Sequence, residues 1–147
     1  MFGKGRKRYS VRIKLDEGAY EPVRAHDTDA GIDIRAMHGA VILPHSGTVI
    51  ETGVHVELPK GCAGVLISKS GLNVNSDLTS TGLIDEGFTG AIMVKLYNHG
   101  DTARYINAGD KISQLVVVPV FYEQIEIVDE INQDTDRGTD GFGSTGR

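Results

Sequence analysis

Residues 25–34 place three carboxylates around Gly31, a composition that suggests a calcium-binding loop. The spacing does not fit an EF-hand, because Ile32 stands where the sharp-turn glycine belongs. His38 likewise stands where the bidentate glutamate belongs. Taken alone, this segment is therefore best interpreted as an acidic turn without a ligand.

Two further segments carry polar groups next to apolar runs. Residues 68–72 (Ser-Lys-Ser-Gly-Leu) offer a cation, hydroxyls and a glycine, which suit phosphate oxygens even though the P-loop spacing is absent. Residues 109–117 place Gln114 inside an otherwise apolar strand. A buried glutamine needs hydrogen-bond partners, so it is either bonded within the fold or turned toward a ligand. The spacing leaves both interpretations open.

Residues 81–90 combine Asp85 and Phe88 with three glycines in an apparent hairpin. A carboxylate and an aromatic ring on one rigid hairpin suit the binding of a water molecule and the covering of a flat or sugar-like surface. By itself the segment is more simply an ordinary glycine-rich turn. Near the C-terminus, Phe142 is the only large apolar residue of 132–147, and it lies among Gly, Ser and Thr beside Arg137. These residue types suit the wrapping of phosphate oxygens.

The elements that must position these segments are short β-strands. The predicted half-buried strands, each with period-two alternation, are 11–15, 54–58, 92–96 and 124–127. The continuous apolar runs 65–67 and 115–118 predict strands that are buried on both faces. Apart from a short helical turn near 71–76, no helical periodicity is present. The sequence predicts an all-β sandwich or barrel.

Composition and charge limit the function classes. The chain has 147 residues, 19 of them glycine, a single cysteine and a net charge of −5, which fit one domain without disulfides. We expect a basic N-terminal tail over 1–9, one β domain over 10–128 and a mobile glycine-rich tail over 129–147 that closes over the active site. Outside 1–8, 11 basic residues face 20 acidic ones (11 − 20 = −9), which disfavours binding of duplex nucleic acid.

The remaining composition excludes other classes of protein. The longest strongly apolar run, residues 115–122, is too short to span a bilayer, and no secretory signal is present, so we expect no membrane contact and a cytoplasmic location. The five histidines are scattered, which disfavours a zinc site. No G-x-S-x-G elbow supports acyl chemistry.

In order and spacing, five segments together resemble the five motifs of the trimeric deoxyuridine triphosphatases (dUTPases). The matching segments are residues 29–33, 69–72, 82–90, 109–115 and 137–146. The resemblance implies a jelly-roll-like β-barrel or sandwich that forms a homotrimer, with each active site shared among subunits. It also implies Mg²⁺-assisted hydrolysis of dUTP to dUMP and pyrophosphate.

The same resemblance assigns roles to individual residues. Asp85 corresponds to the carboxylate that activates the water attacking the α-phosphorus, and Asp33 to the residue that contacts Mg²⁺ through water. Phe88 corresponds to the aromatic ring that packs on deoxyribose. The residues expected on the phosphate side are Lys69, Ser70, Gly71 and Gln114. The hairpin residues expected to face uracil are Leu83, Ile84 and Met93. In the C-terminal tail, Phe142 would stack on uracil, and the phosphate-binding residues would be Arg137, Gly143, Ser144 and Thr145.

Four residues depart from the family pattern. Lys69 replaces the usual Arg, which turns a bidentate phosphate contact into a point-charge contact. Phe88 replaces the commoner Tyr, and Asp140 occupies a position that is often Gly. Thr79 stands where many relatives have an Asn that contacts the pyrimidine, so we include it among the substrate-binding residues.

Two alternatives remain beside dUTP hydrolysis. The dCTP deaminases share the fold but carry a catalytic Glu on the strand after the hairpin, where this chain has Lys95. The other alternative is a regulatory binding protein that uses a nucleotide-gated tail as a switch, with or without turnover.

Overall fold

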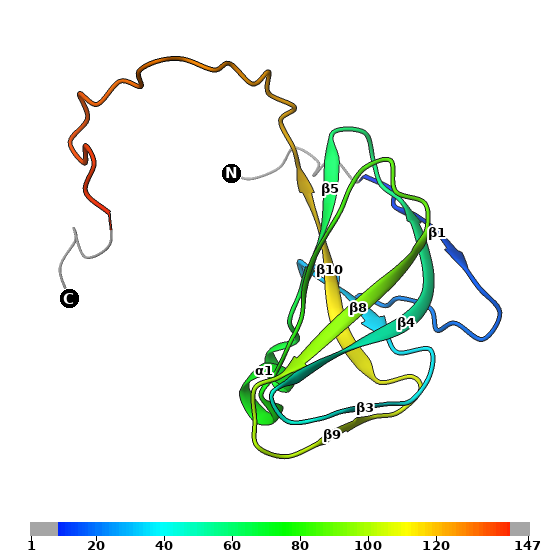
Figure 1. The fold of residues 1–147 in the computed structure, drawn as a ribbon. Coiled ribbons are helices and arrows are strands. Elements are labelled where there is room, and N and C mark those ends of the chain that lie inside the picture. Colours follow the sequence, from blue (N-terminus) through cyan, green and yellow to red (C-terminus); the bar gives the residue numbers. More distant parts are fainter. Residues whose placement is uncertain (1–8, 142–147) are drawn as a thin grey trace.

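The computed structural model describes residues 9–141 and is built mainly from short antiparallel strands (Figure 1). This confirms the predicted all-β class. The elements are, in chain order, β1 (Arg12–Leu15), β2 (Ile32–Arg35), β3 (Ala40–Ile42), β4 (Ser46–Glu57), β5 (Cys62–Ile67), α1 (Ser70–Ser76), β6 (Leu78–Thr79), β7 (Thr81–Ile84), β8 (Ala91–Asn98), β9 (Arg104–Ile106) and β10 (Lys111–Pro119). Within the described residues, no helix is long and apolar enough to cross a membrane.

Two four-stranded sheets face each other across the core. Their strand orders are β1-β4-β8-β6 and β2-β10-β5-β7, and β3 and β9 form a third, two-stranded sheet. The long β4–β8 ladder pairs Ser46 with Asn98 and Glu51 with Met93, and its register shifts before His55 pairs with Ala91. Because most neighbouring strands are distant in sequence, the sheet register decides which chemical groups meet.

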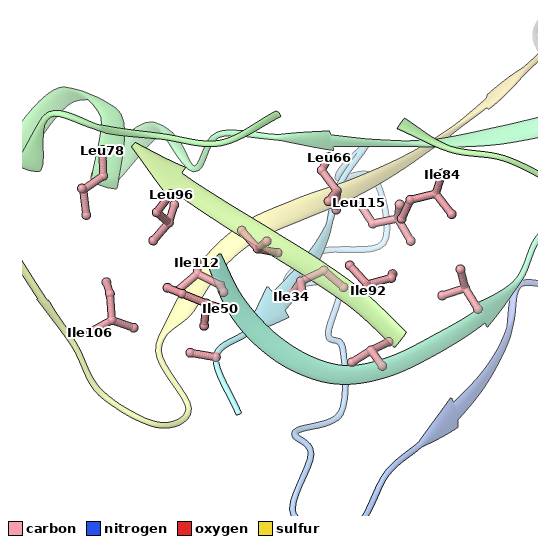
Figure 2. Packing of buried hydrophobic residues seen from close by; sticks show 14 of the residues in the cluster. Ile34, Ile50, Leu66, Leu78, Ile84, Ile92, Leu96, Ile106, Ile112 and Leu115 are labelled. Atoms are coloured by element: carbon pink, nitrogen blue, oxygen red, sulfur yellow. The ribbon is translucent and has the colours of Figure 1, made fainter. Parts of the chain in front are cut away.

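Alternating side chains fill the space between the two large sheets. On β8, Ile92, Val94 and Leu96 are buried, whereas the residues between them face outward. Figure 2 shows how the second sheet contributes Leu66 and Leu115 to the same cluster. This burial follows from the period of two, because successive side chains of a strand point to opposite faces.

The expectation that 65–67 and 115–118 are buried on both faces is wrong. Ile67 is 43% exposed, and residues 116–118 are only partly buried. On the outward face of the β2-β10-β5-β7 sheet, Val65 pairs with both Val116 and Leu83. Within residues 9–141, this half-apolar outer face has no second layer over it, and Leu83 is 69% exposed.

After β10, residues 120–141 form an extended segment that runs away from the β body, which we call the arm (Figure 1). The strand predicted at 124–127 is not formed: Ile125 and Ile127 are 94% and 95% exposed. Alternation alone did not make a strand here, because a strand needs a neighbour for its backbone hydrogen bonds and the arm pairs with no strand of residues 9–141. The last strand ends at Pro119, before the predicted domain boundary at 128.

Candidate active site

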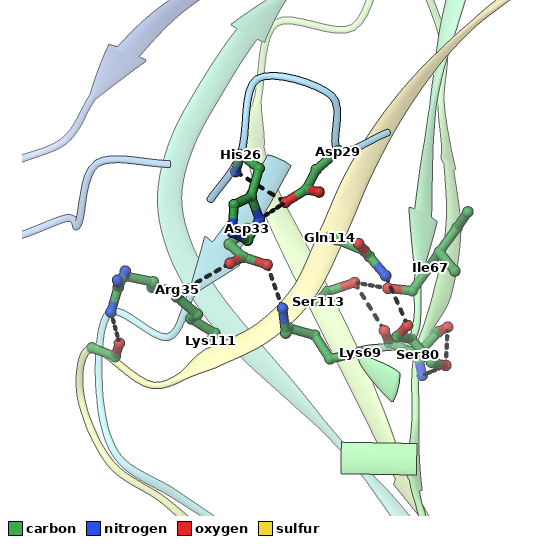
Figure 3. A network of polar contacts seen from close by, with 12 residues as sticks. His26, Asp29, Asp33, Arg35, Ile67, Lys69, Ser80, Lys111, Ser113 and Gln114 are labelled. Atoms are coloured by element: carbon green, nitrogen blue, oxygen red, sulfur yellow. Dashed lines mark hydrogen bonds and ion pairs between the residues drawn. The ribbon is translucent and has the colours of Figure 1, made fainter. Parts of the chain in front are cut away.

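A buried carboxylate with two lysines occupies one end of the β2-β10-β5-β7 sheet. Asp33 on β2 is 6% exposed, and its Oδ1 lies 2.5 Å from Lys69 Nζ while its Oδ2 lies 2.7 Å from Lys111 Nζ (Figure 3). Burial raises the pKa of Asp33, but hydrogen bonds from Lys111 and Lys69 outweigh burial and leave the pKa below its ordinary value of 3.8. The Asp33 cluster (Asp33, Lys69 and Lys111) therefore carries one excess positive charge.

Strand register brings three sequence segments to this cluster. Gln114 on β10 pairs with Asp33 on one side and with Ile67 on the other. Its Nε2 donates to the Ser68 carbonyl at 3.2 Å, so Gln114 is bonded within the fold and also lies beside the cluster. Gly31 makes room for it, because a Cβ at that position would lie 2.2 Å from Gln114 Oε1.

Hydroxyl groups fix the segment that carries Lys69. Ser68 Oγ donates to the Ser80 carbonyl at 3.0 Å and accepts from the Ser80 N–H at 2.9 Å. The Ser80 and Ser113 hydroxyls are 2.9 Å apart, and Ser113 also donates to the Ile67 carbonyl at 3.1 Å (Figure 3). Buried polar groups that are fully bonded rigidify their surroundings, so this network holds the start of α1 in place.

The exposed start of α1 presents the remaining residues expected on the phosphate side. Lys69 is the N-cap residue, followed by Ser70 and Gly71, both exposed. No atom lies within 4 Å of the position that a Gly71 Cβ would take, so the backbone is open to an approaching group. The structure thus brings Lys69, Ser70, Gly71, Gln114 and Asp33 together at one place.

The hairpin between β7 and β8 forms a second group of predicted residues. Asp85 is exposed, and its carbonyl accepts a hydrogen bond from the Phe88 N–H at 3.0 Å. The Phe88 ring lies against Gly90, where a Cβ would meet Phe88 Cζ at 2.7 Å. A cavity of about 260 Å³ opens beside them. Its lining residues are Leu66, Gly82, Leu83, Ile84, Asp85, Phe88, Ala91, Ile92 and Met93.

A side chain next to Asp85 anchors one limb of this hairpin. Glu86 Oε2 accepts from the Gly61 N–H at 2.9 Å and from the Tyr122 hydroxyl at 2.5 Å. The hydrogen bond from Tyr122 and then that from Gly61 lower the pKa of Glu86. The first residues of the arm are thereby attached to the hairpin that carries Asp85.

Within one chain, the Asp33 cluster and the hairpin lie at opposite ends of the β5–β7 ladder. Lys69 lies two residues beyond Ile67, which pairs with Thr81. Asp85 lies four residues after Thr81, just beyond the end of β7 that points away from Lys69. At ~3.3 Å per residue, Lys69 and Asp85 are roughly 20 Å apart. One chain therefore presents the two halves of the predicted site on different parts of its surface.

The other predicted residues lie apart from both groups or outside the described range. Thr79 on β6 pairs with Tyr97, and its hydroxyl lies 2.7 Å from His99 Nε2. Met93, by contrast, lines the hairpin cavity with Asp85 and Phe88. Arg137 lies in the arm and donates to the carbonyl of Asp140. Its other hydrogen bond is to the carbonyl of Gly141, the last described residue. The predicted residues Phe142, Gly143, Ser144 and Thr145 lie outside the described residues.

Comparison with known proteins identifies the family. A family model described as dUTPase matches residues 19–146. A deoxyuridine 5'-triphosphate nucleotidohydrolase of Picosynechococcus is 41% identical over 137 residues, which cover 91% of this chain and 96% of that protein. This chain belongs to the dUTPase family. An enzyme of the same name from Tropheryma whipplei is 42% identical, covering 90% of this dUTPase-family chain and 93% of its own.

Solved structures of phage dUTPases share the fold. The dUTPase of Staphylococcus bacteriophage 80alpha with dUpNHpp superposes with a TM-score of 0.88 at 31% identity, covering 95% of this chain and 100% of that one. A point mutant of the dUTPase from phage phi11 of S. aureus has a TM-score of 0.78 at 30% identity, covering 84% of this chain and 99% of that one. That structure is described as revealing how a structural Mg(II) ion is coordinated. The predicted dUTPase-like architecture is thus confirmed.

Sequence reasoning missed the residues that support the two groups. Lys111 lies inside a segment that the motifs had marked, yet only Gln114 was singled out there. Ser80 and Ser113 gave no signal, because a lone serine in a strand is common and their pairing depends on register. Glu86 follows Asp85 directly in the sequence. A second carboxylate beside the candidate base was the signal that could have pointed to its anchoring role.

Proposed function

We propose that this member of the dUTPase family hydrolyses dUTP to dUMP and pyrophosphate. The observation that carries the proposal is the pairing of Asp85 with Phe88 on one hairpin beside a cavity of about 260 Å³. A carboxylate that orients water and a ring that covers a sugar are the two groups that this reaction needs at the nucleoside end. The position of the catalytic Glu of the deaminases is occupied by Lys95 on β8. Its Nζ lies 4.9 Å from the centre of the Tyr97 ring, so no carboxylate is present at that position.

Asp85 is the proposed base for the attacking water. The water adds to the α-phosphorus, the bond to the oxygen bridging the α- and β-phosphorus breaks, and pyrophosphate leaves while Asp85 takes the proton. An ionised aspartate is a modest base, so much of its effect comes from holding the water in line with the breaking bond. The turn from Asp85 to Phe88 supports such positioning.

The hairpin cavity is the proposed nucleoside pocket. The Phe88 ring packs on deoxyribose and leaves no room for a 2′-hydroxyl, which would discriminate against UTP. Backbone groups around Leu83, Ile84 and Met93 face the uracil edge, where a fixed pattern of donors and acceptors rejects cytosine. Arg137, together with Gly143, Ser144 and Thr145 further along the chain, would bind the triphosphate and offset charge in the transition state, and Phe142 would stack on uracil.

The Asp33 cluster is the proposed phosphate side. Lys69 would release Asp33 and bind phosphate oxygens as a point charge, together with Ser70 and Gly71 at the exposed start of α1. Lys111 stays available to balance the Asp33 carboxylate. Because the cluster carries one excess positive charge, it attracts an anion although the chain is acidic overall.

Asp33 also fits a magnesium contact made through water. Among residues 9–141, no group of three or more His, Cys, Asp or Glu side chains is arranged to hold a metal ion. Once Lys69 has turned to phosphate, one Asp33 oxygen is freed, and a single carboxylate of this kind suits an outer contact to Mg²⁺ that the triphosphate itself holds. When bound, Mg²⁺ supplies charge compensation on the phosphate oxygens.

We further infer that the working unit is a homotrimer with shared active sites. The separation of roughly 20 Å between Lys69 and Asp85 supports this, because one triphosphate must contact both groups. The half-apolar outer face with Val65, Leu83 and Val116 offers a surface that a second copy would bury. The arm, with its exposed alternating isoleucines, offers a strand for another copy. The buried free Cys62 supports a reducing, cytoplasmic location.

Replacing Asp85 tests the proposed reaction. The Asp85→Asn variant should bind dUTP but release pyrophosphate at least about a hundredfold more slowly, because the general base is lost. The matched control is Asp101→Asn, whose carboxylate is 93% exposed and remote from the hairpin. Each protein is incubated with Mg²⁺ and dUTP, UTP, dCTP or dTTP, and pyrophosphate and ammonia are quantified. Normal turnover by Asp85→Asn would refute its role, and ammonia from dCTP would establish deamination.

A regulatory switch is the second candidate function. The phage 80alpha dUTPase, similar over 95% of this chain, is described as controlling transfer of virulence genes by a G protein-like mechanism. The attachment of the arm to the hairpin through Tyr122 and Glu86 would let bound nucleotide change the position of the arm. Tight dUTP binding without any turnover in the assay above would favour the switch alone.

A further inference from the structure

His55 connects the hairpin of the proposed site to a neighbouring strand. It lies on β4 opposite Ala91, the first residue of β8, just after the shift in register. Its Nδ1 lies 2.8 Å from the carbonyl oxygen of Thr89, and its Nε2 lies 3.0 Å from Asp16 Oδ2. The side chain is 22% exposed.

Both partners of His55 can only accept hydrogen bonds. A backbone carbonyl has no proton to give, and the hydrogen bond from His55 is the largest influence keeping the pKa of Asp16 low. The ring can therefore donate to both partners only when both of its nitrogens carry a proton, that is, as an imidazolium. The Thr89 carbonyl and then Asp16 raise the pKa of His55 above its ordinary value of 6.5, while burial and Lys14 oppose the rise.

Two charged groups beside His55 balance each other. Arg12 on β1 and Glu57 on β4 line the same surface hollow as His55. They form an exposed ion pair, with Arg12 Nη1 3.0 Å from Glu57 Oε2. Lys14 Nζ also lies 3.5 Å from Asp16 Oδ1, so Asp16 is shared between Lys14 and His55. The carboxylate of Asp16 is thus the one acidic group in direct contact with the imidazole ring among the described residues.

The carbonyl of Thr89 belongs to the limb of the hairpin that returns from Phe88 to β8. This limb includes Gly90 and follows Gly87, so its backbone has little restriction of its own. Glu86 fixes the opposite limb through Gly61. Without the contact to Thr89, the described structure gives the return limb no comparable side-chain attachment before β8 begins.

We propose that protonated His55 is a positioning residue for dUTP hydrolysis, bridging the Thr89 carbonyl and the Asp16 carboxylate and so holding Phe88 and Asp85 in their working geometry. The inference rests on the proposed function of the hairpin. When His55 loses its proton, one ring nitrogen presents a lone pair to an acceptor. The neutral ring can donate to only one of its two acceptors, and the charged Asp16 carboxylate is the stronger of them. The contact to the Thr89 carbonyl is then lost, and the hairpin becomes looser.

The direction of the pH effect follows from these partners. The bridge is complete between pH 3.8, above which Asp16 is ionised, and pH 6.5, and it is lost as the pH rises through the raised pKa of folded His55. The loss of this hydrogen bond loosens both Phe88, which covers the sugar, and Asp85, which holds the water. We therefore expect kcat/KM for dUTP to fall about tenfold.

Variants of the bridge test the proposal by their pH profiles of kcat and KM for dUTP. His55→Gln cannot donate to both acceptors, so its kcat/KM should be low and should lack the titration. His55→Arg is a permanent cation that can donate to both, so it should stay active at high pH. Asp16→Asn removes the carboxylate and should move the midpoint to lower pH, which a purely structural role would not do. The matched control His45→Gln, whose ring contacts Asp101, should keep the parent profile.

Nitrogen-15 NMR of the full chain provides a readout that needs no variant and no turnover. The His55 ring should titrate above 6.5, and the amide signals of Gly90 and Ala91 should shift with the same midpoint. A His55 midpoint below 6.5, or an unchanged profile in both Asp16→Asn and His55→Gln, would overturn the proposal. Absence of dUTP turnover by the parent protein at every pH would instead overturn the proposed function, while the amide titration would still decide whether the bridge exists.

Discussion

At the scale of single residues, Asp33 shows how one buried carboxylate sets the charge of a site. Its two oxygens accept from Lys69 and Lys111, and the carboxylate holds both cations near the exposed start of α1. A buried charge is tolerated only when paired, so the three side chains act as one unit. Lys69, which stands in place of the usual family Arg, is part of this unit, and in the proposed site it would contact phosphate as a point charge rather than as a bidentate group.

This unit makes folding stability depend on pH in a defined direction. Because the pKa of Asp33 is lowered in the folded protein, its stabilising effect is present above its ordinary value of 3.8 and is lost as the pH falls through the lowered value. Asp33→Asn should therefore reduce the free energy of unfolding by about 2 kcal/mol at pH 7 and by less at pH 3, which lies below the ordinary pKa of 3.8. Reversible urea unfolding at both pH values measures this. An equal loss at both pH values would contradict the charge-based account, and Asp101→Asn is the control.

At the scale of elements, the arm is separate from the core. The buried cluster ends at Leu115, and the partly buried Val117 is its last contributor before β10 ends at Pro119. The arm is joined to the body near its start by the hydrogen bond from Tyr122 to Glu86. Its role in the proposed reaction is therefore separable from its contribution to folding.

Deleting residues 137–147 should leave the β body folded. The free energy of unfolding should change by no more than about 0.5 kcal/mol, because no core residue is removed. Turnover of dUTP should fall at least about a hundredfold, since Arg137 and the residues after it no longer offset charge on the triphosphate. Unfolding and pyrophosphate release are measured on the same samples, with Arg137→Ala as the single-residue comparison. Unimpaired turnover by the shortened chain would show that the arm has no catalytic part.

At the scale of the whole molecule, the separation of Lys69 from Asp85 determines how a site can be assembled. Both residues are supported by contacts within one chain. The Ser68–Ser80 hydrogen bonds hold the segment that carries Lys69, and the hydrogen bond from Gly61 to Glu86 holds the hairpin that carries Asp85. Each half of the proposed site is therefore supported locally, and in the proposed trimer a second copy would bring the opposite half against it.

Mixed assemblies should restore activity that neither parent has. Asp85→Asn and Lys69→Ala homotrimers should each be inactive, while trimers co-refolded from equal amounts of both should recover about a quarter of normal turnover, because a site can then draw its intact halves from different chains. Light scattering establishes the trimer, and pyrophosphate release measures the recovery. If the mixture stays as inactive as its parents, the halves belong to one chain and the shared-site proposal fails.

Much of the fold was predictable from local patterns. The alternation at 92–96 correctly predicted which face of β8 is buried, because the side-chain period of a strand is independent of its neighbours. The same reasoning failed for Ile67 and for 124–127. Periodicity reports which side chains share a face, but whether a second layer or a partner strand covers that face depends on the rest of the fold.

The sequence by itself determined the all-β class and the order of the five motif segments, and it singled out Asp85 and Phe88 as candidate residues on the hairpin. Only the tertiary structure decided which residues contact Asp33 and the hairpin. Lys111 meets Asp33, and His55 meets Thr89, through contacts between segments far apart in the chain. Such contacts are set by strand register, and a shift of one residue would turn each side chain to the opposite face.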